Sequence, residues 1–230
     1  ATGLIDVDST RGGALALGTL NAGQGITLDT TGGITVAALA AGGALAVGGV
    51  REPAAVTFAG NASARSITVD VTGAFVGQNL SATAGGIDID AATITAAALA
   101  ATGGGATLLT TGNVTTAAIN TTGAIDVDST AGGAFNLGAL TSGAGITLDT
   151  TGTITAAAIA ATGDMVVGAL RKPAAMTLTG NASARSITLD VTGAFGGPNL
   201  TSTAGGIDID ARTIAAGVLA ASGGNVRLLS

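Results

Sequence analysis

Short segments in which apolar and polar residues alternate recur along the whole chain. In residues 26–43, ITLDTTGGITVAALAAGG, apolar side chains fall at +0, +2, +8, +10 and +13 from Ile26. A period of two predicts half-buried strands, and the Thr-Thr-Gly-Gly between them predicts a turn. The Ala-rich stretch 96–101 has helical propensity, but it is short and is bounded by β-branched residues and Gly. We therefore expect strands and no helices.

The alternating segment returns about every 20 residues. Its copies start at Ile5, Ile26, Leu45, Ile67, Ile87, Ala106 and Ile125. Successive starts are 19 to 22 residues apart, and the six steps together span 120 residues. One such turn cannot bury its apolar face alone, whereas stacked turns pair each strand with its equivalents above and below. The pattern predicts two inward columns on this face: Ile5, Ile26, Leu45, Ile67, Ile87, and Val7, Leu28, Val47, Val69, Ile89. Phe58, Phe75 and Phe135 are expected to fill wider places in the core.

A second, longer repeat has a period of 120 residues. NASARSITVD at 61–70 returns as NASARSITLD at 181–190, and TAGGIDID at 83–90 returns unchanged at 203–210. About two-thirds of the residues agree at this offset without a gap. The prediction is one continuous all-β fold over residues 1–230, a right-handed parallel β-helix (β-solenoid) of about 11–12 turns. Residues 1–120 form a first six-turn unit, and residues 121–230 form a second, truncated unit.

Composition excludes several functions. The chain has 39 Gly, no Cys and no His, which removes the commonest zinc ligands, thiol nucleophiles and Ser-His triads. Eight basic residues against fourteen acidic ones (net charge −6) argue against nucleic acid as a partner. No apolar run approaches the ~20 residues of a spanning helix, so no membrane insertion is expected. The aspartates recur with the repeat and do not form one unique cluster, so we expect no enzyme.

Two longer runs carry a family resemblance, GITLDTTGGITVAALAAGGAL and GIDIDAATITAAALAATGG. They resemble the repeat regions of filamentous-haemagglutinin-type exoproteins, which are two-partner-secreted or autotransported bacterial adhesins. The resemblance covers essentially the whole chain and rests on period and composition. It implies a stiff β-helical stalk, secreted and held at the bacterial cell surface. Binding to a host surface, other cells or matrix is then expected through regions outside this chain.

We therefore expect a section of the shaft of a longer adhesin or extracellular fibre. One alternative is a self-assembling filament or biofilm-matrix subunit that stacks end to end, because open strand edges invite pairing. Another is an ice-binding solenoid, suggested by partial threonine columns. Those columns contain Thr10, Thr31, Thr72, Thr111 and Thr130.

Eight aspartates share one outward position of their turns and are candidate Ca²⁺ ligands. They are Asp8, Asp29, Asp70, Asp90, Asp128, Asp149, Asp190 and Asp210. Carboxylates stacked about 5 Å apart repel each other, and bound calcium would relieve that repulsion. The other interpretation is a solvated acidic stripe without any cofactor. The glycine-rich nonapeptide of calcium-binding β-rolls is not present, which favours the stripe.

The third turn of each unit departs from the pattern. Its corner is Val50-Arg51-Glu52-Pro53 in the first unit and Leu170-Arg171-Lys172-Pro173 in the second, and it contains the only Glu and the only Lys of the chain. These corners predict a protruding loop, either a lateral contact between rods or a plain surface bulge.

Six asparagines lie in Asn-x-Ser/Thr sequences and are candidate glycosylation sites. They are Asn61, Asn79, Asn113, Asn120, Asn181 and Asn199. Asn also favours tight corners, which is the simpler interpretation of these positions.

Overall fold

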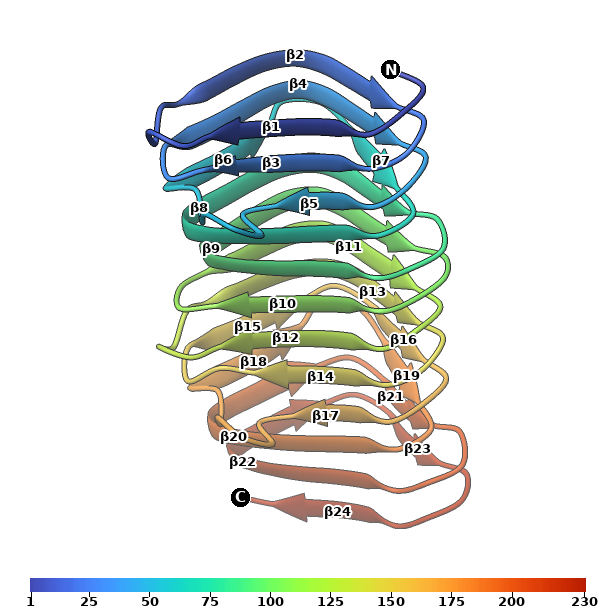
Figure 1. Cartoon of the computed structure of the whole chain (residues 1–230). Coiled ribbons are helices and arrows are strands. Elements are labelled where there is room, and N and C mark those ends of the chain that lie inside the picture. The colour runs from blue at the N-terminus through green and yellow to red at the C-terminus, as the bar shows by residue number, and fades with distance from the viewer.

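The computed structural model describes all residues 1–230 and contains 24 strands in one parallel sheet, with no helix. The chain winds into a rod of stacked coils, and its two termini lie at opposite ends (Figure 1). It therefore offers no helix with the length and apolar character needed to cross a bilayer. The all-β solenoid predicted from the sequence is confirmed.

Each coil has three short faces. Face one begins each coil and consists of β1 (Ile5–Ser9), β3 (Ile26–Thr30), β5 (Leu45–Val47), the first part of β8 (Ile67–Ala82), the first part of β9 (Ile87–Ala101), β10 (Ala106–Thr110), β12 (Ile125–Ser129), β14 (Ile146–Asp149), β17 (Met165–Val167), the first parts of β20 (Ile187–Gly197) and β22 (Ile207–Ala216), and β24 (Val226–Leu229).

Faces two and three are formed by the remaining strands and by the later parts of the long ones. These strands are β2 (Leu15–Ala22), β4 (Gly33–Ala41), β6 (Ala55–Phe58), β7 (Ala62–Ala64), β11 (Val114–Thr121), β13 (Phe135–Ser142), β15 (Thr153–Ala156), β16 (Ile159–Ala161), β18 (Ala175–Leu178), β19 (Ala182–Ala184), β21 (Leu200–Ser202) and β23 (Leu219–Ala221). β8 and β9 run on around the corners from face one. The Ala-rich segment 96–101 lies in the later part of β9, so it is strand, as expected.

The register along the rod is the one predicted from the spacing of the repeats. Ile5 pairs with Ile26, Ile26 with Leu45, and Leu45 with Ile67. The column continues through Ile87, Ala106 and Ile125 to Val226, so face one has twelve coils. A shift of one residue would turn the apolar set outward, so this register is strongly specified.

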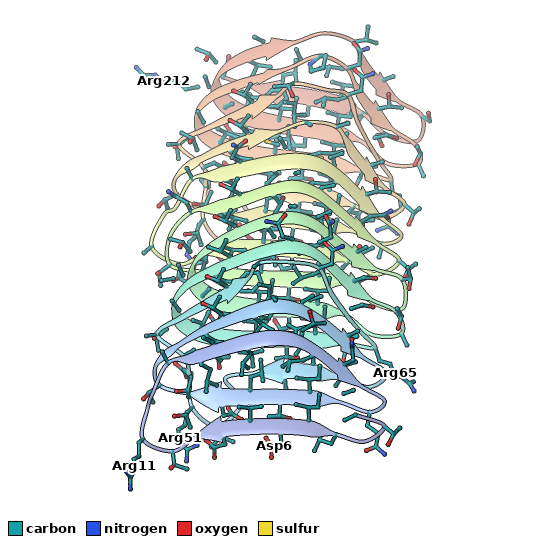
Figure 2. All side chains as sticks on the ribbon, turned by 90° about the horizontal axis from the view of Figure 1, so that it is seen from above. Asp6, Arg11, Arg51, Arg65 and Arg212 are labelled. Carbon is teal, nitrogen blue, oxygen red and sulfur yellow. The ribbon has the colours of Figure 1, made fainter.

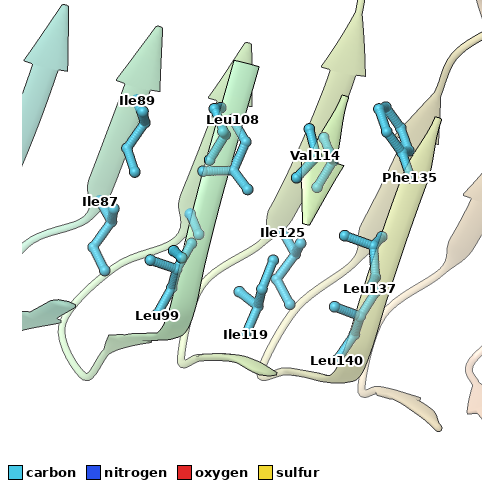
Figure 3. Packing of buried hydrophobic residues seen from close by; sticks show 14 of the residues in the cluster. Ile87, Ile89, Leu99, Leu108, Val114, Ile119, Ile125, Phe135, Leu137 and Leu140 are labelled. Carbon is cyan, nitrogen blue, oxygen red and sulfur yellow. The ribbon is translucent and has the colours of Figure 1, made fainter. Parts of the chain in front are cut away.

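A single core of 53 buried residues runs along the rod. Aliphatic side chains from successive coils lie over one another as ladders, as Figure 3 shows for Leu99, Ile119 and Leu140. Phe58 and Phe75 fill a wider place, with ring centroids 5.4 Å apart and planes at 85°. The narrow cross-section leaves room mainly for aliphatic side chains, which accounts for the scarcity of aromatic residues.

Hydroxyl groups join neighbouring coils at the corners. Thr30 Oγ1 donates to the carbonyl oxygen of Gly13 at 2.7 Å and accepts from the amide of Gly32 at 3.0 Å. Thr150 makes the equivalent pair of bonds in the second unit. Such bonds satisfy corner backbone groups that the strand ladders leave unpaired.

Candidate functional site

The most distinctive surface feature is a loop in the third coil of each unit, residues 48–53 and 168–173. We call these the first and second loops. Gly48 and Gly168 open them with φ of 80° and 81°. A Cβ at Gly48 would overlap the carbonyl oxygen of Asp70, so only glycine fits there. Both loops lie on the same side of the rod, where the chain leaves β5 and β17 (Figure 1).

A buried carboxylate holds the first loop in place. Oδ1 of Asp29 accepts hydrogen bonds from the amides of Val50 at 2.9 Å and Arg51 at 3.3 Å. Asp29 is only 4% exposed, because the loop folds back over it. Its second-unit equivalent, Asp149, is 2% exposed. The prediction that these two aspartates belong to a solvated outward stripe is therefore wrong: the loop covers them.

The same loop also reaches one coil further. Asp8 and Asp29 are register partners on β1 and β3, so their carboxylates are stacked. Arg51 Nη1 forms an ion pair with Asp8 Oδ1. Figure 2 shows Arg51 beside the first coil, whereas Arg11 projects away from the rod. One arginine of the third coil thus compensates a carboxylate of the first.

The second unit repeats this arrangement. The amides of Leu170 and Arg171 donate to Asp149 Oδ1 at 2.8 and 3.2 Å. Arg171 pairs with Asp128, which is the register partner of Asp149. The loop and its two aspartates therefore form a built element that recurs with the 120-residue period.

The two loops place different residues beside the next stacked pair of aspartates. Lys172 Nζ lies 2.6 Å from Asp190 Oδ2, and Asp190 is stacked on Asp210. In the first unit Glu52 occupies the place of Lys172 and borders a hollow of about 220 Å³ together with Asp70 and Asp90.

No cation lies beside this pair of carboxylates, Asp70 and Asp90, so nothing offsets the repulsion between them. Partial desolvation, together with the neighbouring Asp70 and Asp88, raises the pKa of Asp90 above its ordinary value of 3.8. The eight candidate calcium ligands thus meet as four stacked pairs, Asp8–Asp29, Asp70–Asp90, Asp128–Asp149 and Asp190–Asp210. No three acidic side chains gather closely enough to hold a metal ion together. Calcium binding stays a prediction.

A further ion pair was not predicted from the sequence. Arg185 Nε donates to Asp164 Oδ1 at 2.8 Å, and Ser186 Oγ donates to the same oxygen at 2.6 Å. These bonds lower the pKa of Asp164 to about 2. In the first unit the equivalent residue is Ala44, so Arg65 projects into solvent instead (Figure 2). The replacement of Ala by Asp at a 120-residue offset was the available signal.

All six candidate glycosylation asparagines are exposed. Several of them make hydrogen bonds to a neighbouring coil: Asn79 Nδ2 donates to Asn61 Oδ1 at 3.1 Å, and Asn113 Oδ1 accepts from the amide of Ala134 at 2.8 Å. Asn199 Oδ1 accepts from the amide of Val218 at 3.0 Å. These contacts support a structural role, and glycan occupancy stays a prediction.

The threonines Thr10, Thr31, Thr72, Thr111 and Thr130 are exposed where face one ends. A more regular threonine column, which the repeat pattern did not predict, lies on face two. Thr35 pairs with Thr57, Thr95 with Thr115, and Thr155 with Thr177. Val76, Asn136 and Gly196 interrupt that column.

Comparison of the chain with protein-family models, curated proteins and solved structures finds no match. The geometry defines the class of fold, a parallel β-solenoid with two copies of one carboxylate-anchored loop. In each copy the buried aspartate holds the loop in place, and the loop exposes charged side chains and one apolar side chain, Val50 or Leu170.

Proposed function

We propose that this chain is a rigid spacer, a section of the shaft of a bacterial cell-surface adhesin or extracellular fibre. The observation that carries the proposal is the ladder of face one, which stays in register through all twelve coils. With about 4.8 Å between parallel strands, twelve coils make a rod roughly 50–60 Å long.

Continuous pairing makes such a rod stiff, because bending it strains backbone hydrogen bonds and core contacts in every coil at once. The core of 53 residues has no break between the two units. The absence of cysteine means that this stiffness requires no disulfide. The resemblance to haemagglutinin-type repeats supports the cell-surface and extracellular setting.

Adding a unit tests the spacer directly. Residues 61–180 span one full period, so duplicating them in tandem adds six coils, or about 29 Å. We expect small-angle scattering to show a longer rod of unchanged cross-section. A compact or flexible particle, or a length that does not grow with the added unit, would contradict the proposal.

The runner-up is a filament subunit that stacks end to end. It is favoured by the repeat itself, because β24 is the equivalent of β10, and β10 pairs in register with β12, the equivalent of β1. Electron microscopy of the concentrated protein distinguishes the two functions. Long unbranched filaments support the filament subunit, and monodisperse short rods support the spacer.

The threonine column on face two favours a third candidate, ice binding. Its interruptions at Val76, Asn136 and Gly196 leave it less regular than an ice lattice requires. A measurement of thermal hysteresis decides this candidate, and we expect none.

A further inference from the structure

Each loop presents one apolar side chain at its tip. Val50 is 77% exposed and Leu170 is 78% exposed. The only other exposed large apolar side chain away from the first coil and the last two coils is Val76. Two equivalent loops therefore place the same kind of apolar knob on the same side of the rod, six coils or about 29 Å apart.

The knobs are held rigidly. The carboxylates of Asp29 and Asp149 accept hydrogen bonds from the loop amides. Gly48 and Gly168 set the turn at which each loop begins. At the end of the first loop, the carbonyl oxygen of Pro53 accepts from both the amide and the hydroxyl of Thr72 at 3.0 Å. A preorganised apolar tip loses little conformational entropy when it is covered by a partner. The exposed Val and Leu are thus suited to a contact rather than to a mobile bulge.

The charges beside the knobs identify the partner. The first loop carries Glu52 next to Asp70 and Asp90, while its Arg51 is paired with Asp8. The second loop carries Lys172, whose side chain is 53% exposed although it pairs with Asp190. An ammonium group has three donors, so Lys172 can bind a second carboxylate while it keeps Asp190. The first loop is complementary to the second, and a like-with-like contact would oppose Glu52 to Glu52.

We propose that the two loops together form an interface for a second copy of this chain, packed antiparallel alongside the first. A two-fold axis between the loops, perpendicular to the rod, places Val50 against Leu170 of the second copy and Glu52 beside its Lys172. The same axis generates the reciprocal contact, so the assembly closes as a dimer. This inference goes beyond the proposed spacer, which functions equally as a single rod.

The contact is small at each loop, and affinity comes from making both contacts at once. Interfaces of this size are transient, so we expect dimers at concentrations of about 10 µM and above. Sedimentation equilibrium over a concentration series measures the dimer. The double variant V50S/L170S is expected to remain monomeric, and V76S is the matched control that should dimerise normally.

Charge exchange tests the complementarity. E52K places a lysine in both loops and K172E places a glutamate in both, so each single variant should weaken dimerisation at least tenfold. The double variant E52K/K172E exchanges the charges and should restore it. Thermal unfolding of each variant is followed in parallel, because K172E also removes the cation beside Asp190. Dimerisation that is insensitive to all of these substitutions would overturn the proposal.

The absence of cysteine allows a direct test of the pairing. A V50C chain mixed with an L170C chain should cross-link under mild oxidation, whereas V50C alone should not. Cross-linking of V50C to itself would overturn the antiparallel arrangement. A monomer at all concentrations, or open-ended polymers in place of a closed dimer, would overturn the interface while leaving the spacer intact.

Discussion

The ammonium group of Lys172 lies 2.6 Å from Oδ2 of Asp190, and in the other unit the equivalent residue is the acidic Glu52. Two copies of one structural element thus carry opposite charges at one position. The first unit therefore serves as an internal control for the second.

The first prediction concerns Asp90. Its pKa is raised by partial desolvation, by Asp70 and by Asp88. Because folding disfavours the ionised form, Asp90 destabilises the fold above its folded pKa, and protonation relieves this cost as the pH falls through that value. We expect E52K to place a cation beside Asp70 and Asp90 and to lower the Asp90 pKa, as measured by carboxyl NMR titration. The neutral variant E52Q should lower it less, and an unchanged pKa in E52K would contradict the assignment.

The second prediction concerns the buried anchor of the first loop. Asp29→Ala leaves the amides of Val50 and Arg51 without their acceptor and should cost about 2–3 kcal/mol of unfolding free energy in a urea titration. Hydrogen exchange at residues 50 and 51 should rise with it. The control is Asp70→Ala, since Asp70 has no such contacts with the loop. A D29A chain as stable as D70A would show that the loop needs no anchor.

The third prediction concerns the ion pair of the second unit. The Arg185 and Ser186 hydrogen bonds hold the pKa of Asp164 at about 2. A lowered folded pKa means that the carboxylate stabilises the fold above about pH 4, and that this stability is lost as the pH falls toward 2. We expect R185Q to raise the Asp164 pKa toward 3.8. R65Q, its counterpart beside Ala44, should leave the carboxylate titrations of the first unit unchanged; a shift there would reveal a partner for Arg65.

The fourth prediction concerns the core. Thr116 is 3% exposed, and its hydroxyl has no hydrogen-bond partner. Thr116→Val removes that unpaired group at nearly constant volume and should stabilise the protein by about 1 kcal/mol. Thr110 is the matched control, because its hydroxyl donates to Ala92 O at 2.7 Å and accepts from Gly112. Thr110→Val should destabilise by about 1–2 kcal/mol, and equal effects at both positions would refute the distinction.

The architecture followed from the sequence because each coil repeats the same local pattern. Ile26, Leu28, Ile34, Val36 and Leu39 were expected to point inward from their alternation, and all five are buried. The register followed as well, since a solenoid pairs each strand with the next copy of itself. Local periodicity and tertiary contacts are here the same information.

The loop anchors could not be predicted in this way. Asp29 occupies an outward position of its strand, and alternation therefore placed it in solvent. Its burial depends on the loop that begins 19 residues later, at Gly48, and folds back over it. The same loop brings Arg51 to Asp8, which lies 43 residues earlier in the sequence. No local pattern encodes that contact. The repetition of the loop at 168–173 marked its importance, but not its partners.

A rigid spacer requires the chain to be one rod with a fixed spacing between its two units. Thr68 and Thr188 are equivalent exposed positions on face one, six coils apart. Spin labels at T68C and T188C, in a chain without other cysteines, measure their separation by double electron–electron resonance. We predict a single narrow distribution centred at about 29 Å, six parallel-strand spacings. A broad distribution, or a centre far from that distance, would contradict the rigid spacer.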